Sequence, residues 1–311
     1  CINTFGDSIA GWNIAESENM IFLDPQGDPT FMMDEFKDQK LFEKLSRTKK
    51  DIKIILPEKS SVERFGSGWS WGIWQQTYAP ERSMMPIYGN MVNFLVDGQK
   101  LYTVPTYFSN SILNKDSLEK LKPYISVLRN EQNNNFYLVK NTARNRLSRP
   151  FTTNGSNHLS FELLKDTLQK VNPGIKLSRL EKSPPHLTWK KFNTIPTDIL
   201  LGAMMKRSDN FFAEQILLMV SKERLGYFSN REIIEDISKN TIPNVLGNSQ
   251  WADGSGLSRN NLISPEAYIK LLKFIYNSPY FERIKQILPS SNQGTLKGLY
   301  IGYENQIWAK T

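Results

Sequence analysis

The paired prolines Pro184 and Pro185 are the sequence feature that most limits how this chain can fold. Neither proline can donate a backbone hydrogen bond, and each restricts the residue before it, so no helix or central strand can continue through the pair. The hydrophobic pattern also changes here, from short and alternating apolar runs to helical spacing. We therefore expect two parts, residues 1–185 and residues 186–311.

The part before the prolines is mixed and rich in expected strands. Residues 91–96 alternate in character, and Asp97-Gly98 then turns the chain into residues 101–104, which predicts a β-hairpin. The other expected elements are strands at residues 52–56 and 136–139, a helix at residues 34–49, and a helix that Ser160 caps and Asn172-Pro173-Gly174 ends.

The part after the prolines is more helical. Thr197 is expected to cap a helix whose apolar residues begin at Ile199, and a second helix begins at Phe211, so the break between the two helices falls at Ser208-Asp209-Asn210. Ser264-Pro265 predicts the start of a further helix, because proline is favoured at the first helical position. The last residues, 306–311, are expected to form a strand.

The composition is that of a globular protein with a modest excess of positive charge. Hydrophobic residues make up 39% and charged residues 23% of the 311 positions, which argues against a disordered chain. No stretch approaches the roughly 18 apolar residues of a membrane-spanning helix. The net charge of +8 could suit several anionic partners, but the basic residues are scattered, so we expect a solvated surface and no nucleic-acid site.

Cysteine and histidine are too scarce for several kinds of site. Cys1 is the only cysteine, so an internal disulfide or a thiolate metal site is excluded. We interpret Cys1 as the start of a fragment, with a lipidated cysteine of a mature lipoprotein as the alternative. Only His158 and His186 are present, both in loop-like surroundings, so we expect neither a histidine metal site nor a Ser-His-Asp triad. We expect no metal or organic cofactor, and a lysine as the base of any hydrolase.

Three short motifs in the second part carry polar groups suited to binding a peptide end. Ser208-Asp209-Asn210 places a hydroxyl and an amide two residues apart on a helix–helix turn. Asp253-Gly254-Ser255-Gly256 is a tight turn whose backbone can approach a ligand. Lys310-Thr311 puts a charge and a hydroxyl at the end of an expected strand, where a carboxylate could bind. Each motif alone also has an ordinary explanation as a cap or a turn.

Together and in this order, the motifs match the later part of the serine acyl-transferase signature S-x-x-K, S-D-N, K-T-G. The chain resembles the low-molecular-mass class C penicillin-binding proteins, the D-alanyl-D-alanine carboxypeptidase/endopeptidase family. The blocks that carry the resemblance are GDPTF (27–31), GSGWSW (66–71), YAPERS (78–83), YGN (88–90), SDNFFAEQ (208–215), DGSGLSR (253–259), NQGTL (292–296) and WAKT (308–311).

The resemblance implies a penicillin-recognising, transpeptidase-like α/β fold, with helices on an antiparallel sheet and strand-rich domains inserted between S-x-x-K and S-D-N. Residues 1–185 would be mainly the insertions, and residues 186–311 the second part of the catalytic domain. In the family S-x-x-K precedes GDPTF, and here residues 1–26 contain no such string. The strings at residues 46–49 and 117–120 lie downstream in surface-like sequence. We therefore expect a fragment without the catalytic serine and its lysine.

The resemblance also implies roles for the motif residues in acyl transfer to a serine. Ser208 would relay a proton, Asn210 would hold the substrate amide, and Lys310 and Thr311 would bind the terminal carboxylate near the developing oxyanion. Asp209, Ser255 and Gly256 are expected to line the substrate site. We expect Ser208, Asn210 and Lys310 to meet in one cleft, with Ser46 and Ser117 far from it.

The implied substrate is a peptidoglycan muropeptide ending in D-Ala-D-Ala, with β-lactams as inhibitors and a location in the periplasm or outer cell envelope. One alternative is a non-catalytic cell-wall-binding protein that keeps the fold. Another is a serine esterase or β-lactamase on the same fold, but the GDPTF and GSGWSW blocks favour the carboxypeptidases with inserted domains.

Overall fold

The computed structural model describes residues 1–97, 100–114, 125–140, 146–303 and 306–309. The chain divides into two units, each assembled from segments that are distant in sequence. Unit 1 consists of Cys1–Gly11, Gly66–Ser70 and Asn193–Thr311, and unit 2 consists of Trp12–Phe65 and Trp71–Phe192. The predicted boundary after residue 185 stays a prediction, because compact units do not reveal which segments are insertions.

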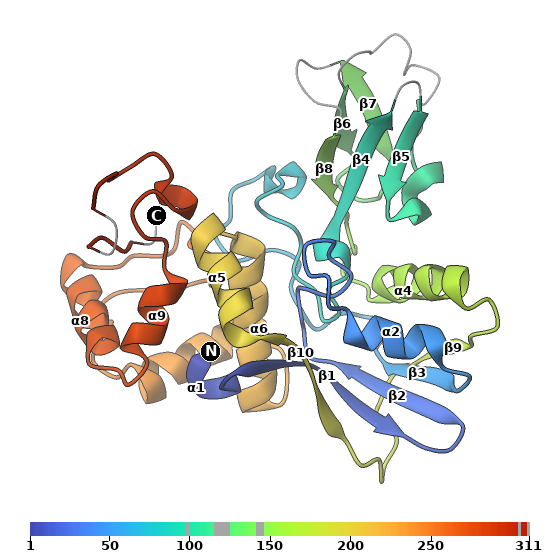
Figure 1. The fold of residues 1–311 in the computed structure, drawn as a ribbon, viewed down its shortest axis with the longest axis horizontal. Coiled ribbons are helices and arrows are strands. Elements are labelled where there is room, and N and C mark those ends of the chain that lie inside the picture. Colours follow the sequence, from blue (N-terminus) through green and yellow to red (C-terminus); the bar gives the residue numbers. More distant parts are fainter. Residues whose placement is uncertain (98–99, 115–124, 141–145, 304–305, 310–311) are drawn as a thin grey trace. The chain divides into compact units, whose positions relative to one another are not determined.

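A five-stranded sheet has the strand order β10-β1-β2-β3-β9 (Figure 1). Strands β1 and β2 pair antiparallel, whereas β2 with β3 and β3 with β9 pair parallel. The bounds of its strands are β1 (Ser8–Glu16), β2 (Met20–Pro25), β3 (Asp51–Ile55), β9 (Leu177–Leu180) and β10 (Lys190–Pro196). The expected strand at residues 52–56 is therefore confirmed as β3.

Two helices of unit 2, α2 (Lys40–Arg47) and α4 (His158–Val171), supply apolar side chains to the core beside this sheet. Leu41 and Leu45 of α2 are buried four residues apart, which places them on one helix face. They share a core with Ile52 and Ile54 of β3, which are fully buried because alternate residues of a strand face the same side. This packing stabilises the mixed α/β part of unit 2.

Two smaller antiparallel sheets complete unit 2. The first has the order β5-β4-β8, and the second pairs β6 with β7. Their strands are β4 (Met91–Asp97), β5 (Lys100–Val104), β8 (Arg146–Pro150), β6 (Ile125–Arg129) and β7 (Phe136–Lys140). Phe94 of β4 and Phe136 of β7 are fully buried and lie edge to face, with ring centroids 5.0 Å apart. The strand pairing of the predicted hairpin and the predicted strand at residues 136–139 are both confirmed, and the turn residue Gly98 lies outside the described residues.

Unit 1 is mainly helical. Its helices are α1 (Ile2–Phe5), α5 (Thr197–Arg207), α6 (Asn210–Leu225), α7 (Asn230–Asp236), α8 (Pro265–Tyr276) and α9 (Phe281–Ile287). Helices α5 and α6 lie beside each other and meet at a short turn (Figure 1). Ten residues of the 16-residue helix α6 are buried, so it forms the centre of the unit. A π-helical turn (Ile237–Thr241) follows α7. Short 3-10 turns in the described parts of both units are Ile73–Gln75, Tyr88–Asn90, Thr106–Asn110 and Gly294–Leu296.

Several expected helix starts differ from those in the structure. The helix expected from residue 34 begins at Lys40, because the Gln39 side chain bonds the backbone of Thr30, Met32 and Phe36 and holds residues 30–39 in a loop. Asn157, not Ser160, precedes the first residue of α4, and Ser160 is buried inside the helix. These differences arise from tertiary contacts of side chains that local propensity does not contain.

Other terminal signals were predicted correctly. Ser264 Oγ accepts a hydrogen bond from Ala267 N at 3.1 Å, and Pro265 occupies the first position of α8. Helix α4 ends at Val171, followed by Asn172 as expected. Capping groups bond backbone within the same turn, so these two helix ends could be predicted from a few neighbouring residues.

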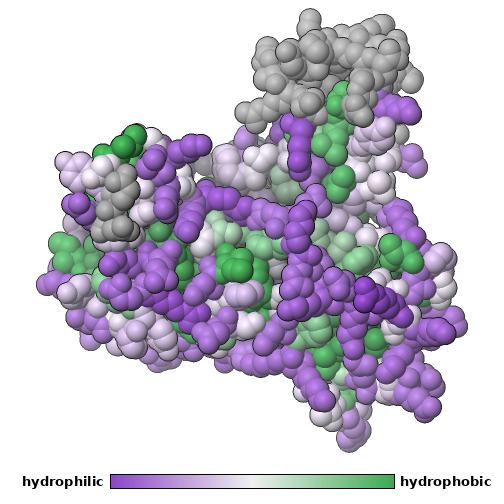
Figure 2. Space-filling view, viewed as in Figure 1, coloured by the Kyte–Doolittle hydropathy of each residue, from purple (hydrophilic) through white to green (hydrophobic). Residues whose placement is uncertain are grey.

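The visible surface of the molecule is predominantly hydrophilic, and its hydrophobic residues form separate small patches (Figure 2). None of the helices in the described ranges is long and apolar enough to cross a membrane.

Candidate functional site

The turn between α5 and α6 holds the Ser208-Asp209-Asn210 motif in unit 1. Ser208 adopts a left-handed backbone conformation with φ 57° and ψ 49°, which costs a residue other than glycine about 1–3 kcal/mol. Asp209 caps α6, since its Oδ1 accepts a hydrogen bond from Phe212 N at 3.0 Å. Asn210 is the first residue of α6. The turn is therefore sharp and fixed at both sides, and its three polar residues are half-buried.

Asp253 organises the loop that contains the second motif. The side chain is only 2% exposed, and its two oxygens accept hydrogen bonds from Gly256 N (2.8 Å), Ser258 N (2.7 Å) and Asn261 Nδ2 (2.7 Å). The Ser255 hydroxyl donates a longer bond of 3.4 Å to Oδ2 of the same carboxylate. Asp253 thus fixes the backbone around Ser255 and Gly256, the two residues predicted to line the substrate site.

Glu214 fastens this loop to helix α6. Its carboxylate is 1% exposed and accepts hydrogen bonds from Ser255 N at 2.8 Å and from Asn230 Nδ2 at 3.0 Å. Gly254 lies directly against the helix, because a Cβ atom there would stand 2.7 Å from Ala213 O. The glycine is required by this close approach of two backbones. The loop is consequently held beside the first turns of α6, which begin at the Ser208-Asp209-Asn210 motif.

The GSGWS segment of unit 1 joins the same cluster. Trp69 Nε1 donates a hydrogen bond of 2.8 Å to Asp253 Oδ2. Ser258 Oγ donates to Ser67 O at 2.6 Å, and Arg259 N donates to Gly68 O at 3.1 Å. A segment almost two hundred residues earlier in the chain therefore supports the second motif.

The NQGTL block packs against the end of α5. A Cβ atom on Gly294 would lie 2.4 Å from Lys206 O, so only glycine allows this approach two residues before Ser208. The residues just before this block pair with the last described residues: Ser290 forms a β-bridge with Trp308, and Ala309 N donates to Pro289 O at 3.1 Å. The chain is thereby anchored at the residue before Lys310.

The structure does not test the convergence of Ser208, Asn210 and Lys310, because Lys310 and Thr311 lie outside the described residues. Ser117 also lies outside them. Ser46 belongs to unit 2, in the last turn of α2, and its hydroxyl donates to Glu43 O within that helix at 2.9 Å. The roles predicted for the motif residues remain predictions.

Three residues of the cluster escaped the sequence reasoning: Trp69, Glu214 and Asp253 were not singled out as individual residues. A glutamate on the apolar side of the predicted helix after Phe211 was a usable signal, since a buried carboxylate needs fixed partners. Across the part of the chain that the structure describes, no group of three or more His, Cys, Asp or Glu side chains is arranged to hold a metal ion.

Comparison with known proteins places the chain among cell-wall peptidases. The family model described as "D-Ala-D-Ala carboxypeptidase 3 (S13) family" matches residues 12–311. The D-alanyl-D-alanine carboxypeptidase DacB of Haemophilus influenzae is 32% identical over 112 residues, which are 33% of this chain and 22% of that protein. A D-alanyl-D-alanine endopeptidase of the same organism is 28% identical over 108 residues, or 35% of each chain. The chain therefore matches well under two thirds of the length of these relatives.

Solved structures agree with the predicted fold class. The crystal structure of penicillin binding protein 4 (dacB) from Haemophilus influenzae superposes with a TM-score of 0.70 and 20% identity, covering 99% of this chain and 74% of that one. A second structure of that protein, complexed with a β-lactam, gives a TM-score of 0.63 and 19% identity, with coverages of 100% and 75%. At this identity the likeness establishes the fold, and it confirms the predicted penicillin-binding-protein architecture.

Proposed function

Because the chain belongs to the D-Ala-D-Ala carboxypeptidase 3 (S13) family, we propose that it forms part of a serine-type carboxypeptidase/endopeptidase acting on peptidoglycan peptides that end in D-Ala-D-Ala. The observation that carries the proposal is the meeting of three motif blocks in unit 1. The Asp253 loop, the start of α6 and the GSGWS segment are bound together by the buried carboxylates of Asp253 and Glu214. Such an arrangement holds substrate-binding backbone in a fixed position.

The proposed reaction is acyl transfer. A serine Oγ forms a bond to the carbonyl carbon between the two D-alanines, the C–N bond breaks, and the departing amine takes a proton. Ser208 passes that proton and Asn210 holds the amide of the acyl part. Lys310 and Thr311 bind the terminal carboxylate, and the lysine charge also favours the developing oxyanion. Water then hydrolyses the serine ester. Asp209, Ser255 and Gly256 complete the walls of the site.

We place the nucleophile outside these 311 residues. A lysine that activates a serine at S-x-x-K must lie one helical turn after it on the same face. Helix α2 ends at Arg47, so Ser46 and Lys49 do not share a helix, and the Ser46 hydroxyl is bonded to its own helix backbone. This geometry does not suit an activated serine.

The proposal includes location and inhibition. A peptidase with this substrate works in the periplasm or outer cell envelope, where peptidoglycan lies. One solved relative is described as complexed with a β-lactam, and β-lactams are accordingly proposed as acylating inhibitors of the complete protein.

Labelling with a fluorescent penicillin tests the proposal. The 311-residue chain is expected to stay unlabelled on a denaturing gel, and the polypeptide encoded by the complete gene is expected to carry one covalent label. In that complete polypeptide, Ser208→Ala should slow labelling by about 10²-fold or more, the lower range for a general acid–base group. Ser183→Ala, at an exposed serine of unit 2, is the matched control. A label on the 311-residue chain at Ser46, Ser117 or Ser208 would refute the placing of the nucleophile.

A further inference from the structure

A cavity of about 520 Å³ in unit 2 plays no part in the proposed reaction. Its floor is one face of the three-stranded sheet. Asn93 of β4 pairs with Ser148 of β8 and with Val104 of β5, so these side chains point to the same side as Met91, two residues earlier. The alternate residue Phe94 points to the other side and is fully buried in the core. The pleat of the sheet therefore separates a packed face from a hollow one.

The wall of the cavity is the loop at residues 32–37, which follows the GDPTF block. Asp28 Oδ1 accepts hydrogen bonds from Thr30 N (2.8 Å) and Thr30 Oγ1 (2.7 Å), which fixes the turn before the loop. The Gln39 side chain then closes the loop. Its Oε1 accepts a hydrogen bond from Met32 N at 3.0 Å, and its Nε2 donates one to Phe36 O at 2.9 Å. The wall is thus formed in advance of any ligand, as binding pockets usually are.

Tyr88 and the YGN block form the adjoining side. Tyr88 lines the cavity, and its hydroxyl shares a 2.7 Å hydrogen bond with Thr167 Oγ1. Burial raises the pKa of this phenol above its ordinary value, so the group stays neutral. A Cβ atom on Gly89 would stand only 3.1 Å from the terminal carbon of Met33, a cavity residue. The left-handed backbone of Gly89 brings the block close to the wall.

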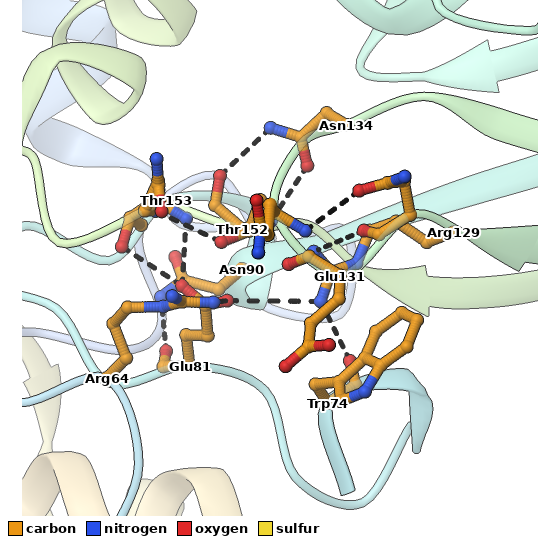
Figure 3. A network of polar contacts seen from close by, with 12 residues as sticks. Arg64, Trp74, Glu81, Asn90, Arg129, Glu131, Asn134, Thr152 and Thr153 are labelled. Atoms are coloured by element: carbon orange, nitrogen blue, oxygen red, sulfur yellow. Dashed lines mark hydrogen bonds and ion pairs between the residues drawn. The ribbon is translucent and has the colours of Figure 1, made fainter. Parts of the chain in front are cut away.

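The YAPERS block supports this side from behind. Asn90 is fully buried, and its Nδ2 donates to Glu81 O at 2.7 Å and to Ser83 Oγ at 2.9 Å (Figure 3). Its Oδ1 accepts a hydrogen bond from Ile87 N at 3.2 Å. Three sequence blocks that the proposed reaction leaves unused, GDPTF, YAPERS and YGN, therefore build one cavity.

The cavity carries charges of both signs. Lys37 and Arg146 are cations and Asp34 and Glu35 are anions, and all four side chains are exposed. Within the described ranges Lys37, Arg146 and Asp34 take part in no ion pair. Met32, Met33 and Met91 also line the cavity, and methionine adapts its shape to aliphatic ligands. A ligand with separated charges on an aliphatic frame matches this lining.

We propose that this cavity binds a short peptide that carries a free carboxylate and an ammonium group. The guanidinium of Arg146 and the ammonium of Lys37 are suited to the carboxylate, and Asp34 is suited to the ammonium group. The cavity volume falls within the roughly 300–1,000 Å³ of small-ligand sites. An uncharged glycan would leave Lys37, Arg146 and Asp34 without charged partners. The inference concerns binding in unit 2 and does not depend on the proposed catalytic function.

A neighbouring hollow of about 510 Å³ extends the site. It shares Met91, Arg146 and Ser148 with the first cavity, and it adds Thr77, Leu147 and Arg149. Arg149 is already engaged, since its Nε donates to Val127 O at 2.6 Å. Arg146 therefore borders both hollows, so a peptide bound at Arg146 can contact both of them.

Isothermal titration calorimetry with the peptide Ala-Glu-Lys-Ala, with both ends free, tests the proposal. This chain is expected to bind it, and Arg146→Met and Asp34→Asn should each weaken the affinity about 10- to 100-fold, the loss of one charge-assisted hydrogen bond. The matched control is Lys100→Met, an exposed lysine of the same sheet that does not line the cavity, and it should leave the affinity unchanged. Equal affinity in Arg146→Met and Lys100→Met would overturn the proposal.

Methyl spectra of the methionines locate the binding. In chain labelled at the methionine methyl groups, the peptide should shift Met32, Met33 and Met91, and leave Met204 and Met219 of unit 1 unchanged. The peptide acetylated at its amine and amidated at its carboxyl end should cause smaller shifts at equal concentration, because two charges are gone. Shifts confined to unit 1, or shifts caused by a chito-oligosaccharide but not by the peptide, would contradict a peptide site.

Discussion

Each unit contains a buried carboxylate that gathers distant loops, but the two carboxylates are stabilised differently. In unit 2, Glu81 is fully buried, with Arg64 Nη2 at 2.8 Å and Arg129 Nη2 at 3.9 Å (Figure 3). In unit 1, Asp253 is 2% exposed, and its partners are neutral donors such as Trp69 Nε1. Across the described residues Asp253 has no ion-pair partner.

The difference shows two ways of meeting the desolvation cost of a carboxylate. Glu81 is balanced by cations, and burial in turn lowers the pKa of Arg129 to about 10. Removal of Glu81 or of Arg129 alone would weaken the charge balance of the other, which is buried. Asp253 is balanced by dipoles that point at it, two of them backbone N–H groups of its own loop. The first arrangement joins segments through charge pairs, whereas the second fixes the backbone of one loop.

Replacement of Glu81 should have the largest effect. Glu81→Gln leaves Arg129 buried without its anion, so the free energy of unfolding of unit 2 should fall by about 3–5 kcal/mol. Urea denaturation followed by tryptophan fluorescence and circular dichroism measures the loss. Glu63→Gln removes the carboxylate of an 82% exposed side chain that pairs with Arg82 at 3.7 Å, and it should cost under about 1 kcal/mol. Equal losses in the two variants would show that Glu81 is not a charge partner.

Replacement of Asp253 should cost less, because no cation is left behind. Asp253→Asn turns one accepting oxygen into a donor that faces N–H groups, so we expect a loss of about 1–3 kcal/mol in unit 1. The near-ultraviolet circular dichroism of Trp69 should change as well, since its indole loses an acceptor. A loss larger than that of Glu81→Gln would contradict the distinction between charge pairing and dipole stabilisation.

Replacement of Gly254, which lies against helix α6, should have the third-largest effect on stability. Gly254→Ala puts a methyl group 2.7 Å from Ala213 O, and the displacement of the loop should cost about 1–3 kcal/mol. Gly202→Ala in α5 is the control: no atom lies within 4 Å of its added Cβ, and alanine should be neutral or stabilise the helix by up to about 1 kcal/mol. Thermal unfolding distinguishes the two. Opposite signs are expected, and two equal destabilisations would refute the packing argument.

Replacement of Glu16, which contacts two lysines at the surface, should have the smallest effect on stability. Glu16 of unit 2 contacts Lys44 Nζ at 2.8 Å and Lys50 Nζ at 3.1 Å, and chiefly the hydrogen bond from Lys44 lowers its pKa. A lowered pKa in the folded state stabilises the protein above the unfolded pKa, and the contribution disappears as the pH falls through the folded value. Glu16→Gln should therefore cost under about 1 kcal/mol at pH 7.

The difference in unfolding free energy between the unchanged chain and Glu16→Gln should shrink towards zero below pH 4, because Glu16 becomes protonated in both the folded and the unfolded state. Denaturation of both proteins at pH 7, 5 and 3 measures this difference, and high salt should reduce it at pH 7. A difference that grows on acidification would give the wrong sign for a carboxylate with a lowered pKa.

The sequence determined the features whose causes lie within a few residues. The pairing of β4 with β5, the Ser264-Pro265 helix start and the break between α5 and α6 were all predicted, because short connections and capping bonds join near neighbours. The order of the motif blocks likewise predicted the family, since it is a property of the sequence itself.

Only the tertiary structure decided which distant segments meet. Trp69 and Asp253 are 184 residues apart, and no periodicity in the sequence couples them. The loop at residues 30–39 also overrode a helical pattern, because the side chain of Gln39 found backbone partners. Buried polar groups take whatever donors the packed chain brings to them, and their burial makes those partners obligatory. The partners of Glu81 and Asp253 therefore depend on the folded arrangement, while the caps and turns depend on local sequence.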